Sequence, residues 1–305
     1  MKIAIIGEAM FEFRGQGAAS TGLQYGGDTL NTAIHIARSG CDVGYVTAVG
    51  KDKLSDALID AWDSEGLDTS HVLRHPDRYP GIYAIHVDPA GERSFLYWRD
   101  QSAARAMFDL PDMAAACSAV ATADLLYFSH ISLAILPPSG RARLIALAET
   151  VRSRGGLVAY DSNFRARLWE SRAAARSWSD RAVAASAIGL PTADDERAMH
   201  GTSESDVEVA ARWLGLGCAE VAVKCGPTGC VLASADHSPE RHACTPMDMV
   251  DSSGAGDAFN GGYLAARAKG ASFETAAKCG HDLALWVISR RGALPRRDDE
   301  APYPA

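Results

Sequence analysis

One stretch of the sequence combines glycines and acidic side chains in a spacing that suits phosphate chemistry. It reads Asp251-Ser-Ser-Gly-Ala-Gly-Asp257 and leads into Ala258-Phe-Asn-Gly-Gly262, which favours the start of a helix. Glycines allow backbone amides to approach a ligand closely, and the first amides of a helix are unpaired donors at the positive end of its dipole. The stretch therefore predicts an anion-binding turn that suits phosphate oxygens or the charge of phosphoryl transfer.

Asp257 is an unusual residue for a turn that only holds phosphate, because its carboxylate would repel the ligand. A carboxylate there is explained if it accepts the proton of a hydroxyl that attacks a terminal phosphoryl group. The alternative is a glycine-rich turn between a strand and a helix, in which Asp257 only complements the helix dipole. The stretch matches neither the G-x-x-x-x-G-K-[ST] loop nor the G-x-G-x-x-G fingerprint, which disfavours a P-loop NTPase and a Rossmann dehydrogenase.

Short apolar runs typical of buried strands recur along the chain and alternate with helical patterns. The runs cover residues 2–7, 43–49, 125–128, 157–160, 187–190 and 221–224. The helical patterns cover residues 29–39, 55–65, 139–154, 206–214 and 257–269, and glycine follows most of them. This alternation predicts βαβ units, and hence an α/β fold with a mostly parallel central sheet between two layers of helices.

Residues 81–99 break this alternation. They read as an antiparallel hairpin, with strands at 81–88 and 92–99 around the turn-like Pro89-Ala-Gly91. Two further short strands are expected at Phe11-Glu-Phe13 and Leu23-Gln-Tyr25. We expect these strands, drawn from about residues 10–26 and 81–100, to form a small β-sheet lid on a single domain that spans residues 1–305.

The composition excludes several classes of protein. The 305 residues carry 30 basic and 38 acidic side chains, a formal net charge of −8, and 47% of them are hydrophobic, which is enough for a globular core. The acidic balance gives no general attraction to nucleic acid or anionic lipid, and no apolar run approaches the ~18 residues that span a bilayer. The seven cysteines are scattered without a C-x-x-C pair. We expect a cytoplasmic protein with free thiols and without nucleic-acid or membrane partners.

Two motifs carry a resemblance to a known family. Asp251–Asp257 resembles the D-T-T-G-A-G-D signature of the ribokinase/PfkB family of sugar and nucleoside kinases, and Gly26-Gly-Asp-Thr-Leu-Asn-Thr-Ala33 resembles its N-terminal G-G-x-x-x-N-x-A. The similarity extends in the expected order to about Pro295. It implies a three-layer α/β/α sandwich with a small β-sheet lid, and phosphorylation of a primary alcohol by ATP with Mg²⁺. The implied general base is Asp257, and the implied anion hole consists of Gly254, Ala255 and Gly256.

The resemblance also implies ligands for the nucleotide and for cations. Lys224-Cys-Gly-Pro-Thr-Gly229 is similar to the nucleotide-binding K-x-G-x-x-G turn of the family. Thr192-Ala-Asp-Asp-Glu196 departs from the N-x-x-E pattern that holds the magnesium–water network, because Thr192 replaces the asparagine and Asp195 or Glu196 must serve as the acid. The implied nucleotide ligands are Asn163, Arg165, Thr192, Lys224, Gly226, Gly229, Gly254, Gly256 and His281. The implied cation ligands are Asp195 or Glu196 for Mg²⁺ through water, and Asp251 for a monovalent ion such as K⁺.

Arginines on two expected strand ends indicate the kind of sugar. Tyr97 and Arg99 share one face of a lid strand, and Tyr83 lies on the partner strand. Arg165 and Arg167 follow a strand end where ligands of α/β sheets bind. Because a guanidinium binds a carboxylate through two hydrogen bonds, this favours an acidic sugar. The alternative is that Arg99 and Arg165 pair with nearby acidic residues or bind ATP phosphates.

The motifs G-G-D-T-L-N, Y-W-R and D-x-N-x-R-x-R-L-W are similar, within the family, to those of bacterial 2-keto-3-deoxygluconate kinases. This resemblance implies ATP-dependent formation of 2-keto-3-deoxy-6-phosphogluconate. The implied sugar ligands are Gly27, Asp28, Asn31, Tyr83, Tyr97, Arg99, Arg165 and Asp257. The alternatives are a kinase for a neutral ketose such as fructose or ribose, and a non-catalytic sensor that binds a sugar acid. The exposed face of the lid predicts a homodimer.

Overall fold

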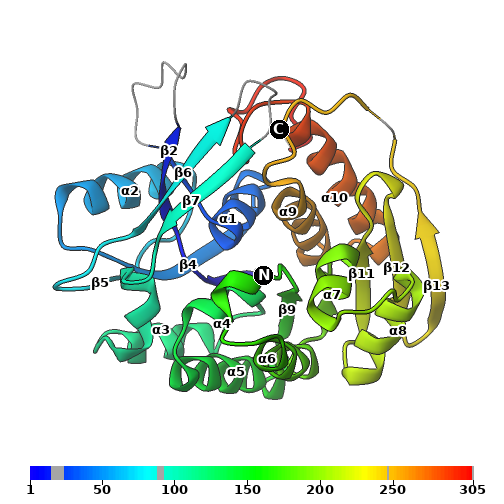
Figure 1. The fold of residues 1–305 in the computed structure, drawn as a ribbon, viewed down its shortest axis with the longest axis horizontal. Coiled ribbons are helices and arrows are strands. Elements are labelled where there is room, and N and C mark those ends of the chain that lie inside the picture. Colours follow the sequence, from blue (N-terminus) through cyan, green and yellow to red (C-terminus); the bar gives the residue numbers. More distant parts are fainter. Residues whose placement is uncertain (15–23, 88–92, 246, 304–305) are drawn as a thin grey trace.

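Two β-sheets form the frame of the protein in the computed structural model, which describes residues 1–14, 24–87, 93–245 and 247–303 (Figure 1). The larger sheet has nine strands within these residues, in the order β13-β12-β11-β10-β9-β8-β1-β4-β5. They are β1 (Lys2–Ile6), β4 (Asp42–Val49), β5 (Val72–Arg74), β8 (Leu125–Ser129), β9 (Leu157–Asp161), β10 (Ile188–Gly189), β11 (Glu220–Lys224), β12 (Cys230–Ser234) and β13 (His237–His242). In this spatial order, every neighbouring pair of strands between β11 and β5 is parallel. Strands β12 and β13 continue the sheet beyond β11 in antiparallel pairing. The predicted, mostly parallel central sheet is therefore confirmed.

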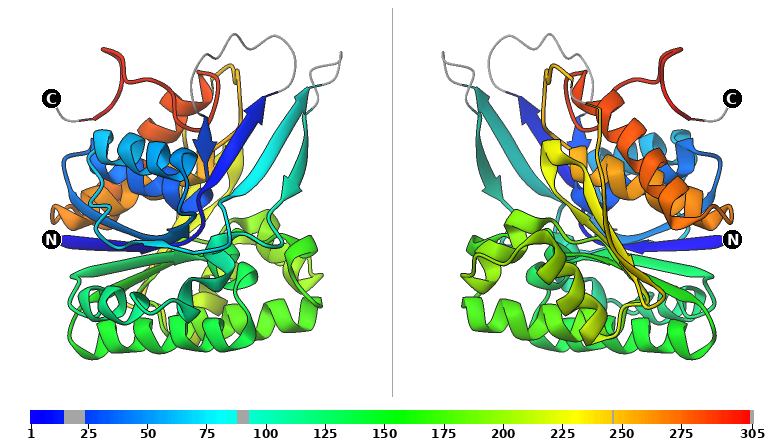
Figure 2. Two further views of the ribbon diagram at one scale, coloured as in Figure 1. Left: turned by 90° about the vertical axis from the view of Figure 1, so that its left-hand side faces the viewer. Right: turned by 90° about the vertical axis from the view of Figure 1, so that its right-hand side faces the viewer.

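Helices cover both faces of this sheet (Figure 2). One layer contains α1 (Asp28–Arg38), α2 (Lys53–Ser64), α9 (Ala255–Ala268) and α10 (Phe273–Ile288). The other contains α3 (Met113–Val120), α4 (His130–Ile135), α5 (Pro138–Ser153), α6 (Arg172–Ala184), α7 (Ala193–His200) and α8 (Asp206–Leu216). Strand β1 is apolar on both faces. Ile3 and Ile5 pack against the first layer of helices, and Ala4 and Ile6 pack against the second. Successive side chains of a strand point to opposite faces, so a strand that is covered on both sides is apolar throughout.

The smaller sheet projects from the edge of the larger one (Figure 2). Its strand order is β3-β2-β6-β7, with β2 (Met10–Arg14), β3 (Tyr25–Gly26), β6 (Gly81–Val87) and β7 (Arg93–Trp98). The predicted hairpin is confirmed, since β6 and β7 are antiparallel and place Tyr83 opposite Tyr97. The predicted turn at 89–91 and the start of the predicted strand at 23 lie outside the described residues.

Glycines on α9 allow this helix to pack closely against α1 and α10. A Cβ atom added to Gly261 of α9 would lie 2.5 Å from the Cβ of His35 on α1, and one added to Gly262 would lie 2.6 Å from the carbonyl oxygen of Cys279 on α10. Helix α9 can therefore lie close to both neighbours only because these positions lack side chains. The connections contain short 3₁₀ helices, η1 (Ala103–Asp109), η2 (Ala166–Leu168) and η3 (Gly226–Thr228).

Candidate active site

The predicted anion-binding turn is the start of α9. Gly254 caps the helix in the left-handed conformation, with φ 72°, and a Cβ atom there would lie 2.5 Å from the Cβ of Ala293. Glycine is therefore required for both backbone angle and space. The helix begins at Ala255, so its first amides, which have no acceptor inside the helix, lie at Ala255, Gly256 and Asp257. Their partial positive charge faces the side chain of Asp257 and any anion beside it.

Asp257 is held from α1. The amide nitrogen of Asn31 donates to Oδ2 of Asp257 at 2.8 Å, and the hydroxyl of Thr32 donates to the backbone oxygen of Asp257 at 3.2 Å. The residue as a whole is partly exposed, so Asp257 is not enclosed in the packed interior. Burial and the charges of Asp28 and Asp161 raise the pKa of Asp257 to about 8, against the opposing effects of Asn31 and Lys224. Asp257 is therefore a stronger base than an ordinary carboxylate once it is ionised, which becomes the main form above about pH 8.

Asp28 lies beside this carboxyl and belongs to the same cluster. Its Oδ2 accepts a hydrogen bond from Nδ2 of Asn163 at 3.0 Å. Burial raises the pKa of Asp28, a hydrogen bond from Ser129 lowers it, and the charge of Asp161 raises it further. The structure thus brings Asp28, Asn31, Asn163 and Asp257 into one group, from α1, α9 and the segment after β9.

A buried network lies directly behind this group. Nζ of Lys224 is 3.0 Å from Oδ1 of Asp161 and 2.9 Å from Oδ1 of Asn260. Nδ2 of Asn260 donates to Oδ2 of Asp161 at 2.8 Å and to the hydroxyl of Tyr127 at 3.1 Å. Strands β8, β9 and β11 are thereby joined to α9 at their carboxyl ends. Sequence reasoning missed this role for Asp161 and Asn260, although Asn260 lies one helical turn after Asp257 and so on the same side of α9.

The small sheet contributes an aromatic wall. The rings of Tyr83 and Tyr97 have centroids 6.1 Å apart, and the guanidinium carbon of Arg167 lies 5.6 Å from the centroid of Tyr97. Arg99 lies 5.9 Å from the same ring, but it is buried and forms an ion pair with the buried Glu8, which also accepts from Ser102. Arg167 thus joins the main body to the lid face, a contact that sequence reasoning did not assign.

The glycine pair of the N-terminal motif allows the lid to approach. A Cβ atom on Gly26 would lie 2.3 Å from the hydroxyl of Tyr83, and one on Gly27 would lie 2.3 Å from the backbone oxygen of Glu8. Side chains at either position would push β3 away from the ends of β1 and β6. Gly27 is therefore at the site because of its backbone rather than of any side-chain chemistry.

Arg165 pairs with Asp195, one of the predicted magnesium ligands. The Arg165 side chain is 52% exposed and reaches Asp195 at 3.4 Å. Burial raises the pKa of Asp195, and Arg165 lowers it. Thr192 is bridged to Lys224 through the backbone and lies at the start of α7. Glu196 is not brought here, because it is fully buried and bonded to Arg212 at 2.8 Å and to the indole of Trp213 at 3.1 Å.

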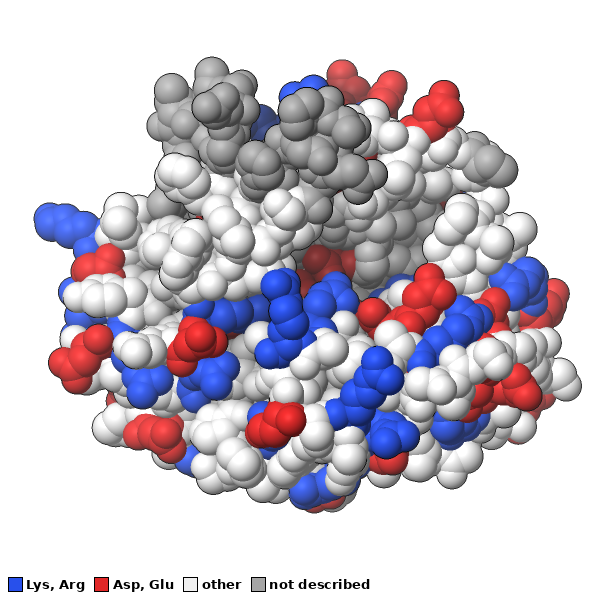
Figure 3. Space-filling view, in the orientation of Figure 1, with Lys and Arg blue, Asp and Glu red and all other residues white. Residues whose placement is uncertain are grey.

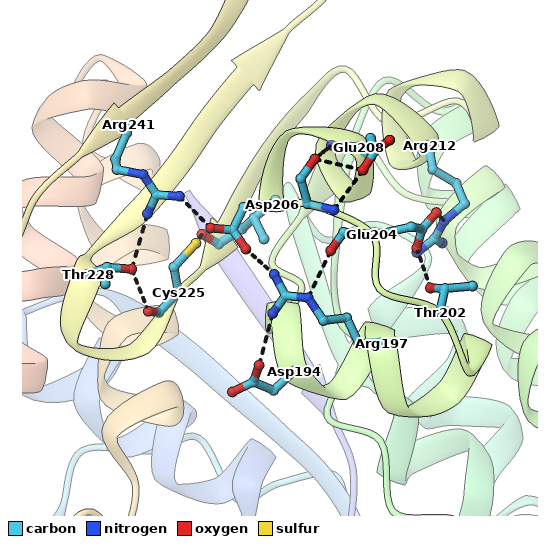
Figure 4. Close-up of polar contacts among 12 residues, drawn as sticks. Asp194, Arg197, Thr202, Glu204, Asp206, Glu208, Arg212, Cys225, Thr228 and Arg241 are labelled. Atoms are coloured by element: carbon cyan, nitrogen blue, oxygen red, sulfur yellow. Dashed lines mark hydrogen bonds and ion pairs between the residues drawn. The ribbon is translucent and has the colours of Figure 1, made fainter.

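The predicted nucleotide turn lies between β11 and β12. Gly226 and Gly229 have φ of 57° and 93°, and a Cβ atom on Gly229 would lie 2.0 Å from the backbone oxygen of His242. Beside the turn, Arg197 and Arg241 reach Asp206 from opposite sides (Figure 4). These groups border a polar hollow of about 160 Å³ that is lined by Ala193, Asp194, Arg197, Asp206, Cys225 and Thr228.

His281 and Asp251 contact α9 and the turn before it, respectively. His281 lies on α10 with its ring centroid 5.2 Å from that of Phe259, and burial lowers its pKa. Asp251 is buried and accepts hydrogen bonds from the amides of Ser253 at 2.8 Å and Gly292 at 2.7 Å, so it fixes the anion-binding turn to the segment after α10. Within the described part of the chain, no group of three or more His, Cys, Asp or Glu side chains is arranged to hold a metal ion.

One face of the molecule is hollowed. Lys and Arg side chains gather across the middle of this face beneath the small sheet, and acidic atoms lie deeper in the hollow (Figure 3). An anionic ligand that entered this hollow would meet positive charge at its mouth.

Comparison with known proteins agrees with this geometry. The chain is 40% identical to the 2-dehydro-3-deoxygluconokinase of Escherichia coli (strain K12) over 304 residues, which cover 97% of this chain and 98% of the relative. It is also 40% identical to the enzyme of that name from Dickeya dadantii (strain 3937), over 96% of each chain.

A solved structure with the same fold is that of a putative ribokinase II in complex with ATP and Mg²⁺ from E. coli, with a TM-score of 0.82, 22% identity, and coverage of 96% of this chain and 94% of that one. A sequence model of the pfkB family carbohydrate kinases matches residues 1–299. The ribokinase-like α/β/α fold expected from the motifs is thus confirmed, and the chain belongs to the pfkB family of carbohydrate kinases.

Proposed function

We propose that the protein transfers the γ-phosphoryl group of ATP to the terminal hydroxyl of 2-keto-3-deoxy-D-gluconate, forming 2-keto-3-deoxy-6-phosphogluconate. Four relatives that carry the name 2-dehydro-3-deoxygluconokinase are 37–40% identical over nearly their whole lengths. The observation that carries the proposal is Asp257, which is held by Asn31 at the first turn of α9 and stays partly exposed.

In this reaction Asp257 accepts the proton of the attacking hydroxyl, while the first amides of α9 stabilise the negative charge that develops on the transferred group. The side-chain oxygen of Asn31 is buried and has no hydrogen-bond donor among the described residues. A substrate hydroxyl beside Asp257 would supply that donor, because a buried acceptor without a partner is costly. Asn31 would then orient both the base and the sugar.

The acid group of the sugar would bind to the two arginines that follow β9. Arg165 is half-exposed and Arg167 lies over Tyr97 at the lid, so both can turn toward a carboxylate. Arg99 is already neutralised by Glu8, and its contribution would be to position Tyr97 rather than to bind the carboxylate itself. Asp28, Gly27 and Tyr83 would complete the sugar site.

The nucleotide would lie across the glycines of both turns. Gly226, Gly229, Gly254 and Gly256 would allow close approach of the backbone to phosphates, and Asn163, Arg165, Thr192 and His281 would supply side-chain contacts to the nucleotide. Asp195 would hold Mg²⁺ through water, and Mg²⁺ would supply charge neutralisation on the phosphates of ATP. A K⁺ ion near Asp251 stays a prediction.

The proposal also covers the cellular location, the domain organisation and the association of the enzyme. None of the helices in the described residues is both long and apolar enough to span a bilayer. We expect a cytoplasmic enzyme in which one domain carries both sheets. The outer face of the small sheet exposes Phe13, Ile82, Leu96 and Trp98, and a second copy of the chain would cover it.

The proposal is tested by measuring ADP formation with 2-keto-3-deoxygluconate, its galactonate epimer, fructose, ribose and a nucleoside. We expect the keto acids to give kcat/KM values at least ~100-fold above those of the neutral sugars, since a guanidinium clamp discriminates for a carboxylate. A preference for fructose or ribose would support the neutral-sugar alternative. Binding of the acid without ADP formation would support a sensor.

A further inference from the structure

The buried network around Lys224 differs from what a nucleotide ligand requires. The side chains of Lys224 and Asp161 are only 9% and 3% exposed, and Asn260 is fully buried. A lysine ammonium has three protons, and two of them are directed to Asp161 and Asn260. A lysine that binds phosphate as a mobile charge normally keeps its ammonium in the ligand cavity. Here the ammonium is fixed inside the protein by two partners.

The orientation of every group in the network is determined by its hydrogen bonds. Because Lys224 can only donate, the side-chain oxygen of Asn260 must face it, and the amide nitrogen of Asn260 must face Asp161 and Tyr127. Each oxygen of Asp161 thus has its own donor. A polar network whose donors and acceptors are paired in this way has one arrangement, so it holds α9 at one position relative to the strand ends.

The network is close to the reacting groups. A Cβ atom on Gly256 would lie 3.8 Å from Nζ of Lys224, so the ammonium lies against the backbone of the anion-binding turn. Asp257 is one residue further along α9. The charged groups that act on it are Asp28 from α1, Asp161 from β9 and Lys224 from β11, with the neutral amide of Asn31 bonded to it. Lys224 is the positive charge among these groups, and it favours the ionised form of Asp257.

We propose that Lys224, Asp161 and Asn260 form a positioning unit that fixes the first turn of α9 and the charge of its surroundings, and that Lys224 is not a ligand of the nucleotide. This inference rests on the proposed kinase reaction, in which Asp257 is the base. It replaces the expectation from the K-x-G-x-x-G resemblance that Lys224 contacts ATP.

The test is the Lys224→Met variant, which keeps the length of the side chain and removes its charge. We expect kcat to fall by about 100-fold, the size of effect that follows when groups around a reacting centre are misplaced, while the Kd for ADP measured by calorimetry stays within about threefold. We also expect the acid limb of the pH profile of kcat/KM to move to higher pH by about one unit, because Asp257 loses the charge that favours its ionised form. The exposed Lys278→Met variant is the matched control, and its kinetics should equal those of the unmodified protein.

The Lys224→Met/Asp161→Asn variant is a second test in case Lys224→Met does not fold. It removes both charges of the buried pair together, so no unpaired charge is left in the interior. Its acid limb should return toward that of the unmodified protein, since the two charges act on Asp257 in opposite directions. A Kd for ADP that rises tenfold or more with kcat unchanged would make Lys224 a nucleotide ligand and overturn the inference. An unshifted pH profile in Lys224→Met, or an upward shift in the double variant, would overturn it as well. The ADP measurement does not depend on which sugar is the substrate, so failure of the proposed function, seen as an inactive unmodified protein, is a separate result.

Discussion

The chemistry attributed to Asp257 depends on its hydrogen bond from Asn31 and on its place in the first turn of α9. We expect Asp257→Asn to lower kcat by at least ~10³-fold, because an amide cannot accept the proton of the attacking hydroxyl, while the first amides of α9 still bind anions. The Kd for ADP should stay within a few fold. Single-turnover kinetics and calorimetry with ADP measure the two effects separately, and turnover close to that of the unmodified protein would remove Asp257 from the role of base.

The raised pKa of Asp257 predicts the direction of the pH dependence. Burial among Asp28 and Asp161 brings this pKa to about 8, so the carboxyl is mainly protonated below that pH and cannot accept a proton. We expect kcat/KM to rise with pH and to level off above about pH 8. Stability should change in the opposite direction, because the folded protein binds a proton that the unfolded chain releases above a pKa of 3.8, so the free energy of unfolding falls as the pH rises from about 4 to about 8. Asp257→Asn should therefore raise Tm more at pH 8 than at pH 4, and a Tm difference that is independent of pH would contradict this.

Residue types and spacing predicted much of the site but not its pairings. Asp257, Asn31, Asp28 and Asn163 come together as the motifs indicate. Arg99 could not be placed from its strand position alone, because its partner Glu8 comes from the end of β1, more than 90 residues earlier in the chain. A charged pair between distant segments leaves no periodic signal in a sequence, and the same holds for the partners of Lys224.

At the scale of elements, the contact between α1 and α9 determines how Asn31 meets Asp257. We expect Gly261→Ala to destabilise the protein by about 1–3 kcal/mol and to lower kcat, because the new methyl group would lie 2.5 Å from the Cβ of His35 and force the helices apart. Gly215→Ala on α8 is the control, since a Cβ there meets no atom within 4 Å and should stabilise the helix by about 0.5–1 kcal/mol. Thermal unfolding and steady-state kinetics measure both effects, and equal Tm shifts in the two variants would contradict the argument.

The proposed selectivity for an acid is assigned to the segment after β9 and to the lid strands. We expect Arg165→Ala and Arg167→Ala each to raise KM for 2-keto-3-deoxygluconate by about 10–100-fold, while KM for a neutral sugar changes little, because only the acid loses a charged hydrogen bond. Arg181→Ala is the control, since Arg181 also lies over an aromatic ring, that of Trp178, but on α6 away from the site. Equal increases for acidic and neutral sugars would show that these arginines do not bind the carboxylate.

The strands that were predicted from the sequence are those whose runs of apolar residues result from burial. Strands β1, β4, β8, β9 and β11 are apolar runs because helices cover both faces, and they were found within a few residues of their bounds. Strand β13 was missed, since its sequence, His237-Ser-Pro-Glu-Arg-His242, is polar and almost wholly exposed at the edge of the sheet. Helix α9 begins two residues before the predicted start, because glycine at Gly256 gave no helical signal.

At the scale of the whole molecule, the two faces of the small sheet have different surroundings. Tyr83 and Tyr97 face the site, whereas Ile82, Leu96 and Trp98 lie on the other face and are 42%, 56% and 61% exposed. Because the two faces of one strand alternate, the sheet cannot present aromatic residues to the sugar without also having a second face to cover. Large apolar side chains gathered on an exposed sheet favour association.

Association of two copies through this outer face therefore gives the last prediction. We expect the protein to be a dimer by light scattering, and Leu96→Asp with Trp98→Lys to make it a monomer, because paired charges in an apolar interface would lose their hydration. The monomer should bind sugar more weakly, since β7 carries Tyr97 on its opposite face and would lose the support of the partner copy. Val207→Glu is the control, because Val207 is a comparably exposed apolar residue on α8 and should leave the dimer intact. An unmodified protein that is monomeric at enzyme-assay and at millimolar concentrations would show that this face stays uncovered and that the lid holds its shape alone.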